Sequence, residues 1–558
     1  MSGPAKIATA EAEFATNVDF DADTTENGMD SLVEPLLPPV VPPDTSASVL
    51  DSNIVETDAV ATLIEFNESE WDHGETQPER CRDWFWGFLF LSQFAVVLVL
   101  AIMGIQNMAK EYSESMAGDD DDHHDSGYNV DQRNMLLVLS LVGSAIAISS
   151  FLINVLLGAF ASMLIQISLV VPPLSCFVTA VASLLTLNVP VAFFSLIMSA
   201  MGAYYAFEVW NKIPFATANL KIALSAIGDN HGLWALAYAV SMQACVWMLL
   251  WCSAVAELVK YSSSWVFDCT SSVDDEISEP VCRVSTPGAF IALGMIFSFF
   301  WTNQVLNNIF HTTIAGVVGT WWFNPEEETQ SARRRSGWCG CRPAIYDSWI
   351  RSNFYSFGSI CFGSSLVGVL KVLQFIVHFG RKRRQEQRRL DDTGPNATDF
   401  LCCLLQFLVD KLELIMEYFN SWAFVYVGLY GYDYWSAGKQ VKTLFMERGW
   451  DVIVNDELVT RSLSMMSWLI SLVTGLVGVF LGYAFLGLGF GIFPLFFFSV
   501  FLGRASCQVL FGVVTSAVDT VVVCFAESPN QLRNKHDPEL FRDLIHAWRK
   551  AYPEDCGF

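Results

Sequence analysis

Long apolar stretches dominate the chain from Trp84 to the mid-520s. About 18 or more apolar residues without charge are enough to cross a hydrocarbon core roughly 30 Å thick. The pattern predicts membrane crossings at 84–105, 134–154, 157–183, 190–208, 232–259, 288–310, 353–378, 400–420, 422–437, 463–486 and 489–525. The last range is too long for one simple crossing, so we expect its end to extend beyond the bilayer.

The composition supports a membrane protein. Of the 558 residues, 53% are hydrophobic and 16% are charged, whereas a soluble domain carries roughly 25% charged residues on its water-facing surface. The net charge of −26 argues against a nucleic-acid partner, because phosphate binding needs clustered Lys and Arg. We therefore predict an all-α polytopic membrane helix bundle of about 10–12 transmembrane segments, with the lipid bilayer as its solvent, rather than a soluble enzyme.

The ends of the chain differ from its middle. Residues 1–80 are strongly acidic, contain only Lys6 and Arg80 as basic groups, and show no sustained periodicity. This composition is typical of a disordered tail. We predict three parts: a disordered acidic cytoplasmic tail at 1–80, a transmembrane transporter domain at 84–525 and a cytoplasmic C-terminal tail at 526–558.

The orientation follows from basic residues near the crossings, which favour the cytoplasmic side. Arg80 and Arg82 precede the first crossing and the acidic loop 119–125 follows it, which places the N-terminus inside. Basic clusters at 333–335 and 381–389 flank a single crossing, so they cannot both be inside. The second is denser, and placing it inside requires 305–323 to turn back or to form a re-entrant, broken helix, as its glycines and polar residues suggest.

Five blocks resemble the choline transporter-like solute carrier family, and they occur in that family's order. They are 211–216 (NKIPFA), 299–323, 356–366, 423–439 and 518–525. The resemblance covers roughly 84–530, and the short loop after the first crossing is similar to the fungal and protist branch. It implies a plasma-membrane, multi-pass transporter of choline or a related small organic cation by alternating access, with proton coupling as an optional addition. An internal membrane is the alternative location.

Two other classes stay open. A nontransporting membrane scaffold or receptor would use the acidic tail to bind partners. An intramembrane acyltransferase would use His311 with Asn307 or Asn308. We rank it lowest and predict a protein that is not an enzyme and needs no cofactor or resident metal.

A quaternary ammonium neither donates a hydrogen bond nor loses its charge. Its site must therefore use aromatic faces, worth about 0.5–2 kcal/mol each, with a carboxylate as a further option. The first candidate cluster for substrate binding lies inside an apolar segment, where polar side chains are costly. It consists of Trp301, Asn303, Asn307, Asn308 and His311. The alternative is that the asparagines hold neighbouring helices together by hydrogen bonds.

A second cluster follows on the chain. Tyr426 and Tyr430 share a helical face near Tyr432, and Asp519 is the best-placed intramembrane carboxylate, beside polar Thr515 and Ser516. The alternative is an interfacial tyrosine belt. Cys269 and Cys282 lie in a polar loop, where a disulfide and two free thiols both remain open.

Overall fold

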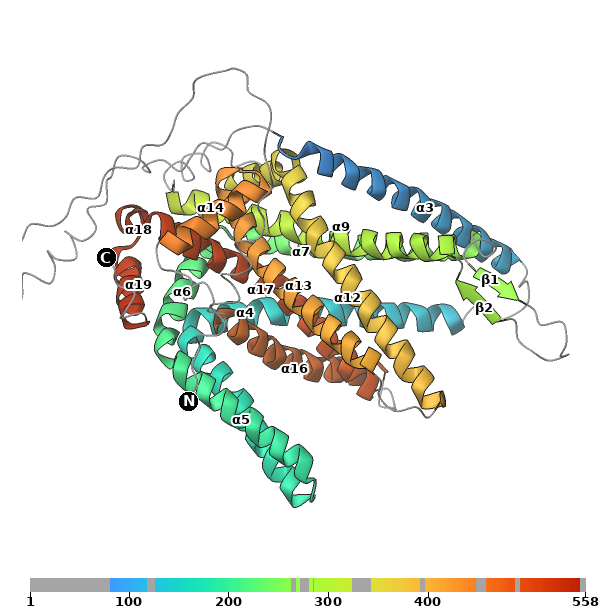
Figure 1. Ribbon diagram of the computed structural model, residues 1–558, viewed down its shortest axis with the longest axis horizontal. Helices are drawn as coiled ribbons and strands as arrows, with labels where there is room; N and C mark the ends of the chain where they lie inside the picture. The colour runs from blue at the N-terminus through green and yellow to red at the C-terminus, as the bar shows by residue number, and fades with distance from the viewer. Residues whose placement is uncertain are drawn as a thin grey trace, which may run out of the picture. The chain divides into compact units, whose positions relative to one another are not determined.

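The computed structural model describes residues 81–117, 126–261, 267–270, 281–284, 286–323, 343–391, 397–447, 458–486 and 492–551. All belong to one compact unit, Leu63–Phe558, and nearly all are helical (Figure 1). The predicted all-α fold is confirmed. The predicted tail at 1–80, the acidic loop 119–125 and the basic cluster 333–335 lie outside the described residues.

The described elements are, in chain order, α3 (Trp84–Ala117), α4 (Ser126–Leu185), α5 (Val189–Val209), η2 (Trp210–Lys212), α6 (Ile213–Asp229), α7 (Gly232–Tyr261), β1 (Phe267–Thr270), β2 (Val281–Val284), α9 (Thr286–Phe323), α11 (Pro343–Ile350), the π-helix η3 (Arg351–Tyr355), α12 (Phe357–Asp391), α13 (Ala397–Tyr430), α14 (Tyr434–Glu447), α16 (Leu458–Leu486), α17 (Ile492–Glu527), α18 (Pro529–Lys535) and α19 (Pro538–Ala551).

Eight helical stretches among the described residues are long and apolar enough to cross a membrane. Helix α4 bends at Phe160, where the backbone leaves helical geometry, so its first part is a further helix. Helix α13 is also 34 residues long, although several charged side chains interrupt its apolar character. These two stretches and the eight others correspond to ten of the eleven predicted crossings; the range 422–437 has no separate crossing. The chain is a multi-pass membrane protein.

Two predictions about helix breaks are wrong. Residues 305–323 neither turn back nor break, because α9 runs as one helix from Thr286 to Phe323. Its glycines instead allow other helices to come close: a Cβ on Gly319 would lie 2.2 Å from a methyl group of Leu429. Likewise, the crossings predicted at 400–420 and 422–437 are not separated at 421, because α13 continues to Tyr430.

The helix ends gather at two opposite ends of the bundle. At the end where α3 begins, which we name the Arg82 end, the backbone N–H of Arg82 donates to the Tyr355 carbonyl at 3.3 Å, beside the start of α12. At the other end, which we name the hairpin end, Lys260 near the end of α7 pairs with Glu111 near the end of α3.

This arrangement corrects the predicted orientation. Helix α12 starts at the Arg82 end, and its stretch 357–384 is roughly 40 Å long at 1.5 Å per residue. The basic cluster 381–389 therefore lies towards the hairpin end, not on the side of Arg82. The predicted orientation failed because it placed the denser basic cluster inside, and that placement required a break in α9 that the helix does not have.

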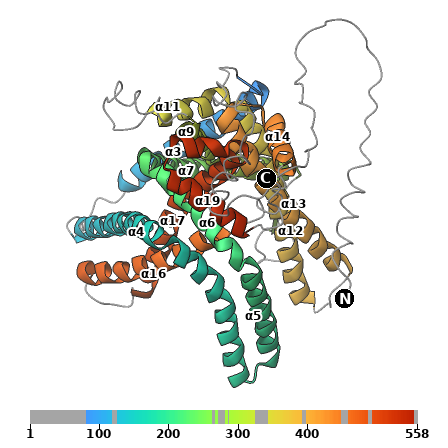
Figure 2. The same ribbon diagram turned by 90° about the vertical axis from the view of Figure 1, so that its left-hand side faces the viewer.

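A short antiparallel hairpin joins α7 and α9. Strands β1 and β2 pair Cys269 directly with Cys282. Both a disulfide and two free thiols remain open for this pair. Elsewhere, α5 packs antiparallel to the second part of α4 (Figure 2), where Ser199 donates to the Pro173 carbonyl at 2.9 Å.

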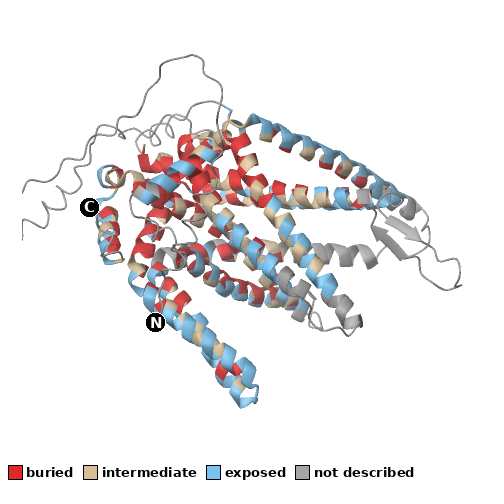
Figure 3. Cartoon of the chain, viewed as in Figure 1, coloured by how far each residue is buried: buried red, intermediate tan, exposed pale blue. Residues whose placement is uncertain are grey.

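Burial divides the bundle into two halves. In the half nearer the Arg82 end, α9, α13 and α17 are buried almost without interruption: residues 312–319, 422–430 and 520–526 (Figure 3). In the other half, the same helices carry many exposed residues. Protein therefore covers these three helices densely towards the Arg82 end and sparsely towards the hairpin end.

Candidate functional site

One face of α9 is polar and poorly covered. Asn303, Gln304, Asn307 and His311 share this face, because residues three and four apart are neighbours on a helix. Asn307 is exposed and the other three are partly exposed, whereas Asn308, which follows directly in the chain, is buried. Apolar lipid tails cannot satisfy such groups, so a polar face in the middle of a membrane helix belongs against the bundle interior or a water-filled cavity.

His311 ends this polar face and joins three helices. Its Nδ1 lies 2.7 Å from the Ser516 hydroxyl of α17, and its Nε2 lies 3.0 Å from the Ser421 carbonyl of α13. The Ser421 hydroxyl donates to Asp519 Oδ2 of α17 at 2.8 Å. His311 and Asp519, separately predicted as substrate-binding residues, therefore lie in one cluster with Ser421 and Ser516.

The partners of His311 define where its protons are. A backbone carbonyl only accepts hydrogen bonds, so Nε2 must carry the proton that it donates to Ser421. When the ring is neutral, Nδ1 accepts from the Ser516 hydroxyl; when the ring gains a second proton, Nδ1 donates to the same oxygen. The cluster thus accommodates either charge state of the imidazole without losing a hydrogen bond to it.

The cluster lies where dense packing begins. On α17, Gln508 is exposed, Thr515 and Asp519 are partly exposed, and Thr520 is fully buried. On α13, Ile415 is exposed and Trp422 is buried. The exposed faces of the three helices therefore end at the level of His311, Ser421 and Asp519, where the densely packed half begins.

The remaining residues of the first predicted cluster point elsewhere. Trp301 is buried, its indole N–H donates to the Cys361 carbonyl at 3.0 Å, and Phe90 packs edge-on against it. The Asn308 amide donates to the Ser364 hydroxyl of α12 at 2.9 Å, and Asn303 donates to a carbonyl of its own helix. The bond from Asn308 to Ser364 is of the kind that the alternative of hydrogen-bonded helices describes. No hydrogen bond pairs His311 with Asn307 or Asn308 among the described residues.

The tyrosine cluster lies at the Arg82 end. The rings of Tyr426, Tyr430 and Tyr432 have centroids 4.8–6.2 Å apart. The Tyr430 hydroxyl donates to Glu527 at the end of α17, and the Tyr426 hydroxyl approaches the same carboxylate at 3.4 Å. Tyr426 and Tyr430 are buried. The rings pack against one another too closely for a cation to lie between them.

An ion pair lies beside this closure. Arg82 is 3.3 Å from Asp433 and its guanidinium lies 5.8 Å from the centre of the Tyr432 ring. Asp433 caps α14, because its carboxylate accepts the backbone N–H of Ser436 at 3.0 Å. Burial raises the pKa of Asp433, but the hydrogen bonds from Ser436, together with Arg82, outweigh it and hold the pKa below its ordinary value.

Sequence reasoning missed the roles of Glu527, Ser421 and Arg82. Glu527 follows the last apolar run directly and precedes Ser528-Pro529, so a carboxylate at the end of a long membrane helix was the available signal. Ser421 interrupts an apolar run, a pattern that equally fits a boundary between two crossings. Nothing in the local sequence indicates that Arg82 pairs with Asp433, 351 positions away.

These features define a multi-pass membrane protein with a polar face on α9 that ends at the His311 cluster, and with a packed tyrosine cluster at the Arg82 end. The chain belongs to the choline transporter-like family: the family model described as "Plasma-membrane choline transporter" matches residues 193–530, more than half of the 558 residues.

Similar proteins come from fungi. Protein PNS1 of Saccharomyces cerevisiae is 23% identical, over 88% of this chain and 87% of its own length. Protein PNS1 of Eremothecium gossypii is 24% identical over 85% of this chain and 81% of its own. Protein PNS1 of Candida glabrata is 26% identical over 86% of this chain and 82% of its own. The predicted family and its fungal-type branch are confirmed.

Proposed function

We propose that this protein transports choline or a related small organic cation across the plasma membrane by alternating access. The observation that carries the proposal is the polar face of α9 that ends at His311, Ser421 and Asp519. A carboxylate at this depth attracts a cation strongly, because few waters compete with the interaction.

The chemistry of the face suits a quaternary ammonium group. Asp519 supplies a negative charge where the polar face of α9 ends. Asn303 and Asn307 supply dipoles along the approach, and Phe300 presents an aromatic ring on the same side of α9, seven residues before Asn307. The ammonium head does not need a hydrogen-bond acceptor, whereas the hydroxyl group of choline does.

The two halves of the bundle correspond to two gates. The hairpin half is open along the polar face, and the tyrosine cluster with Glu527 closes the Arg82 half.

Proton coupling is a part of the same proposal. His311 is the titratable neighbour of Asp519, and its hydrogen-bond partners accept it in both charge states. A proton on His311 and an organic cation beside Asp519 repel each other, so the cluster holds one or the other. Exchange of a proton for a cation follows directly from this competition.

The test is uptake of radiolabelled choline in a transport-deficient host. Wild-type protein should give saturable uptake, and Asp519→Asn should reduce it at least tenfold at equal surface expression. Asp543→Asn, which alters an exposed carboxylate on α19, is the matched control and should behave as wild type. Absence of saturable uptake by the wild type would contradict the assignment of choline as the substrate.

A second measurement addresses the proton. Uptake by the wild type should change between pH 5.5 and 8, and His311→Gln should flatten that profile while retaining measurable uptake. A flat wild-type profile would remove proton exchange from the proposal.

Deleting residues 1–80 should leave uptake largely intact, whereas a scaffold that depends on its tail should lose function.

A further inference from the structure

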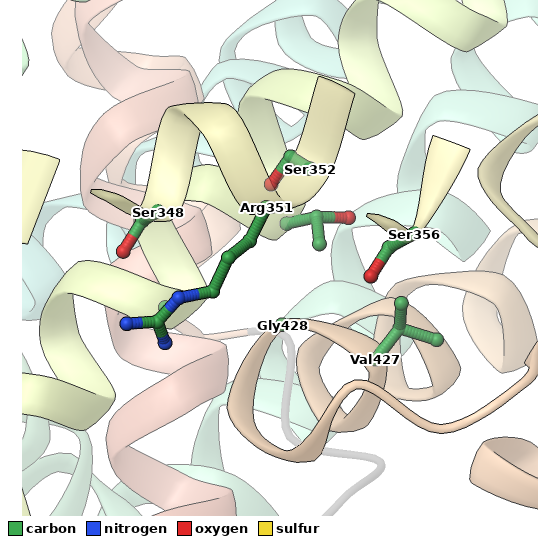
Figure 4. Close-up of a pocket in the computed structure, with 8 residues that line it drawn as sticks. Ser348, Arg351, Ser352, Ser356, Val427 and Gly428 are labelled. Carbon is green, nitrogen blue, oxygen red and sulfur yellow. The ribbon is translucent and has the colours of Figure 1, made fainter. Parts of the chain in front are cut away.

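Charged and amide side chains meet between α12 and α13 in the hairpin half of the bundle. Lys371 Nζ lies 4.0 Å from Glu413 Oε1, and one turn further towards the hairpin end the Gln374 amide donates to Asp410 Oδ1 at 2.8 Å. The gap beside Gly428 in the packed half is too narrow for a water molecule (Figure 4). By contrast, the Lys371 and Glu413 side chains are 26% and 14% exposed, so a small solute can reach both.

This ion pair lies deep in the membrane. The stretch of α12 that can cross the bilayer runs from Phe357 to Arg384, and Lys371 is at its middle, about 20 Å from either end at 1.5 Å per residue. Charged side chains at such a depth are costly, pair with one another, and mark the paths of ions and polar substrates. The position of the pair therefore favours a role in the transport path.

Helices α9, α12 and α13 pack pairwise against one another, and α9 and α13 run in the same direction in one register. His311 of α9 contacts Ser421 of α13, 110 positions later. A Cβ on Gly319 would contact Leu429, again 110 positions later. The same offset, continued towards the hairpin end, places the ion pair level with Asn303, on the polar face of α9.

The register also gives Asp410 an aromatic neighbour in height, because it places this carboxylate level with Phe300. Asp410 precedes Ser421 by eleven residues, and Phe300 precedes His311 by the same number. Eleven residues make about three turns, so in each helix the two residues lie on the same side. A carboxylate and an aromatic ring at one height are the two kinds of group that a quaternary ammonium needs.

We propose that Asp410 and Glu413 form an outer cation site on the way to Asp519, and that the Lys371 ammonium occupies Glu413 when no substrate is bound. The proposal rests on the proposed function, since it assigns a second step to the same path. The lysine and the substrate are both cations, so they compete for one carboxylate. The lysine has a flexible four-carbon stem and can turn away when the substrate arrives. Its competition weakens binding at the outer site, which allows the substrate to move on.

The kinetics of choline uptake test this competition, with all variants compared at equal surface expression. Lys371→Gln removes the competitor and should lower the KM about fivefold. Glu413→Gln should raise the KM at least about tenfold, because the substrate loses an attracting charge. The variant with both substitutions should have the KM of Glu413→Gln, since the lysine acts only through this carboxylate. Lys371→Arg keeps the charge and should retain the wild-type KM.

The matched control is Lys411→Gln, which removes an exposed lysine of α13 two positions before Glu413 and should leave the KM unchanged. If the ion pair only held α12 against α13, Lys371→Gln would lower the unfolding temperature without changing the KM, and the proposal would be overturned. Independent, additive effects of the two substitutions on the KM would overturn it as well.

A binding measurement separates this proposal from the proposed function. Purified full-length protein is titrated with tetramethylammonium chloride at constant ionic strength, with sodium chloride as the replaced salt, and its thermal unfolding is followed. Half-saturating concentrations should rise from Lys371→Gln to wild type to Glu413→Gln, because a ligand of the folded state stabilises it. Absence of choline uptake together with this order would count against transport alone. An equal response of the three proteins would overturn the outer site.

Discussion

Closure of the Arg82 end by Tyr430 and Glu527 predicts a measurable shift between closed and open states. In Tyr430→Phe, the ring stays and the hydroxyl that donates to Glu527 is lost. A hydrogen bond to a carboxylate contributes about 1.5–2 kcal/mol net, and the Tyr426 hydroxyl, at 3.4 Å, is too distant to replace it fully. If opening separates α13 from α17, the open fraction should rise about 10- to 30-fold.

Native cysteines report this opening. Cys524 lies on α17 one turn before Glu527 and is fully buried, so a maleimide should reach it only when the Arg82 end opens. The rate of labelling at Cys524, followed by peptide mass spectrometry, should therefore increase about 10- to 30-fold in Tyr430→Phe. Exposed Cys81 serves as the reference for reagent access, and buried Cys361, beside Trp301, should stay unlabelled.

The controls separate gating from unfolding. Tyr346→Phe removes a hydroxyl from an exposed tyrosine of α11 and should leave labelling at Cys524 unchanged. Faster labelling at both Cys361 and Cys524 would indicate general loosening. An unchanged Cys524 rate in Tyr430→Phe, with the protein folded, would refute the assignment of this cluster as a gate.

Two further predictions concern stability. Gly428→Ala should lower the free energy of unfolding by about 1–3 kcal/mol, because the added methyl would lie 2.6 Å from the Thr312 backbone carbonyl and 2.8 Å from Ala315. In the control Gly143→Ala, the added methyl meets no atom within 4 Å, so stability should not change. Thermal unfolding compares the two variants, and equal midpoints would contradict the close packing at Gly428. Because the pKa of Asp433 is lowered in the folded protein, its ionised form adds stability at neutral pH, and this is lost only as the pH falls below the ordinary value of 3.8. Unfolding temperatures of Asp433→Asn and wild type should therefore differ from pH 7 to 5 and converge below about pH 4, and a difference that already vanished at pH 6 would contradict the assignment.

The sequence could predict the helices and their polar positions because both follow from local patterns. Apolar runs mark the crossings, and the four-residue spacing of Asn307 and His311 by itself places them on one face of a helix. The partnership of Ser421 with Asp519, 98 positions apart, depends on which helices become neighbours. No local pattern contains that information.

The failures have the same physical origin. Glycines in α9 suggested a break, yet Gly316 and Gly319 are places where Ser348 and Leu429 come close. Small residues in membrane helices serve close packing as often as flexibility, and only the neighbour decides between the two. Trp301 shows the reverse case: an aromatic ring suited to a cation is covered by Phe90 and Phe297.

The unbroken course of α9 restricts how the protein can move. The helix has 38 residues, about 57 Å at 1.5 Å per residue, and carries the polar face near its middle. Lacking a hinge at the site, it cannot fold its two halves apart as discontinuous helices do. We therefore expect α9 to stay rigid during transport. Helices α13 and α17 would have to move relative to it, while the depth of His311 in the membrane stays constant. Spectroscopic probes at the two ends of α9 should then report a constant separation throughout the transport cycle.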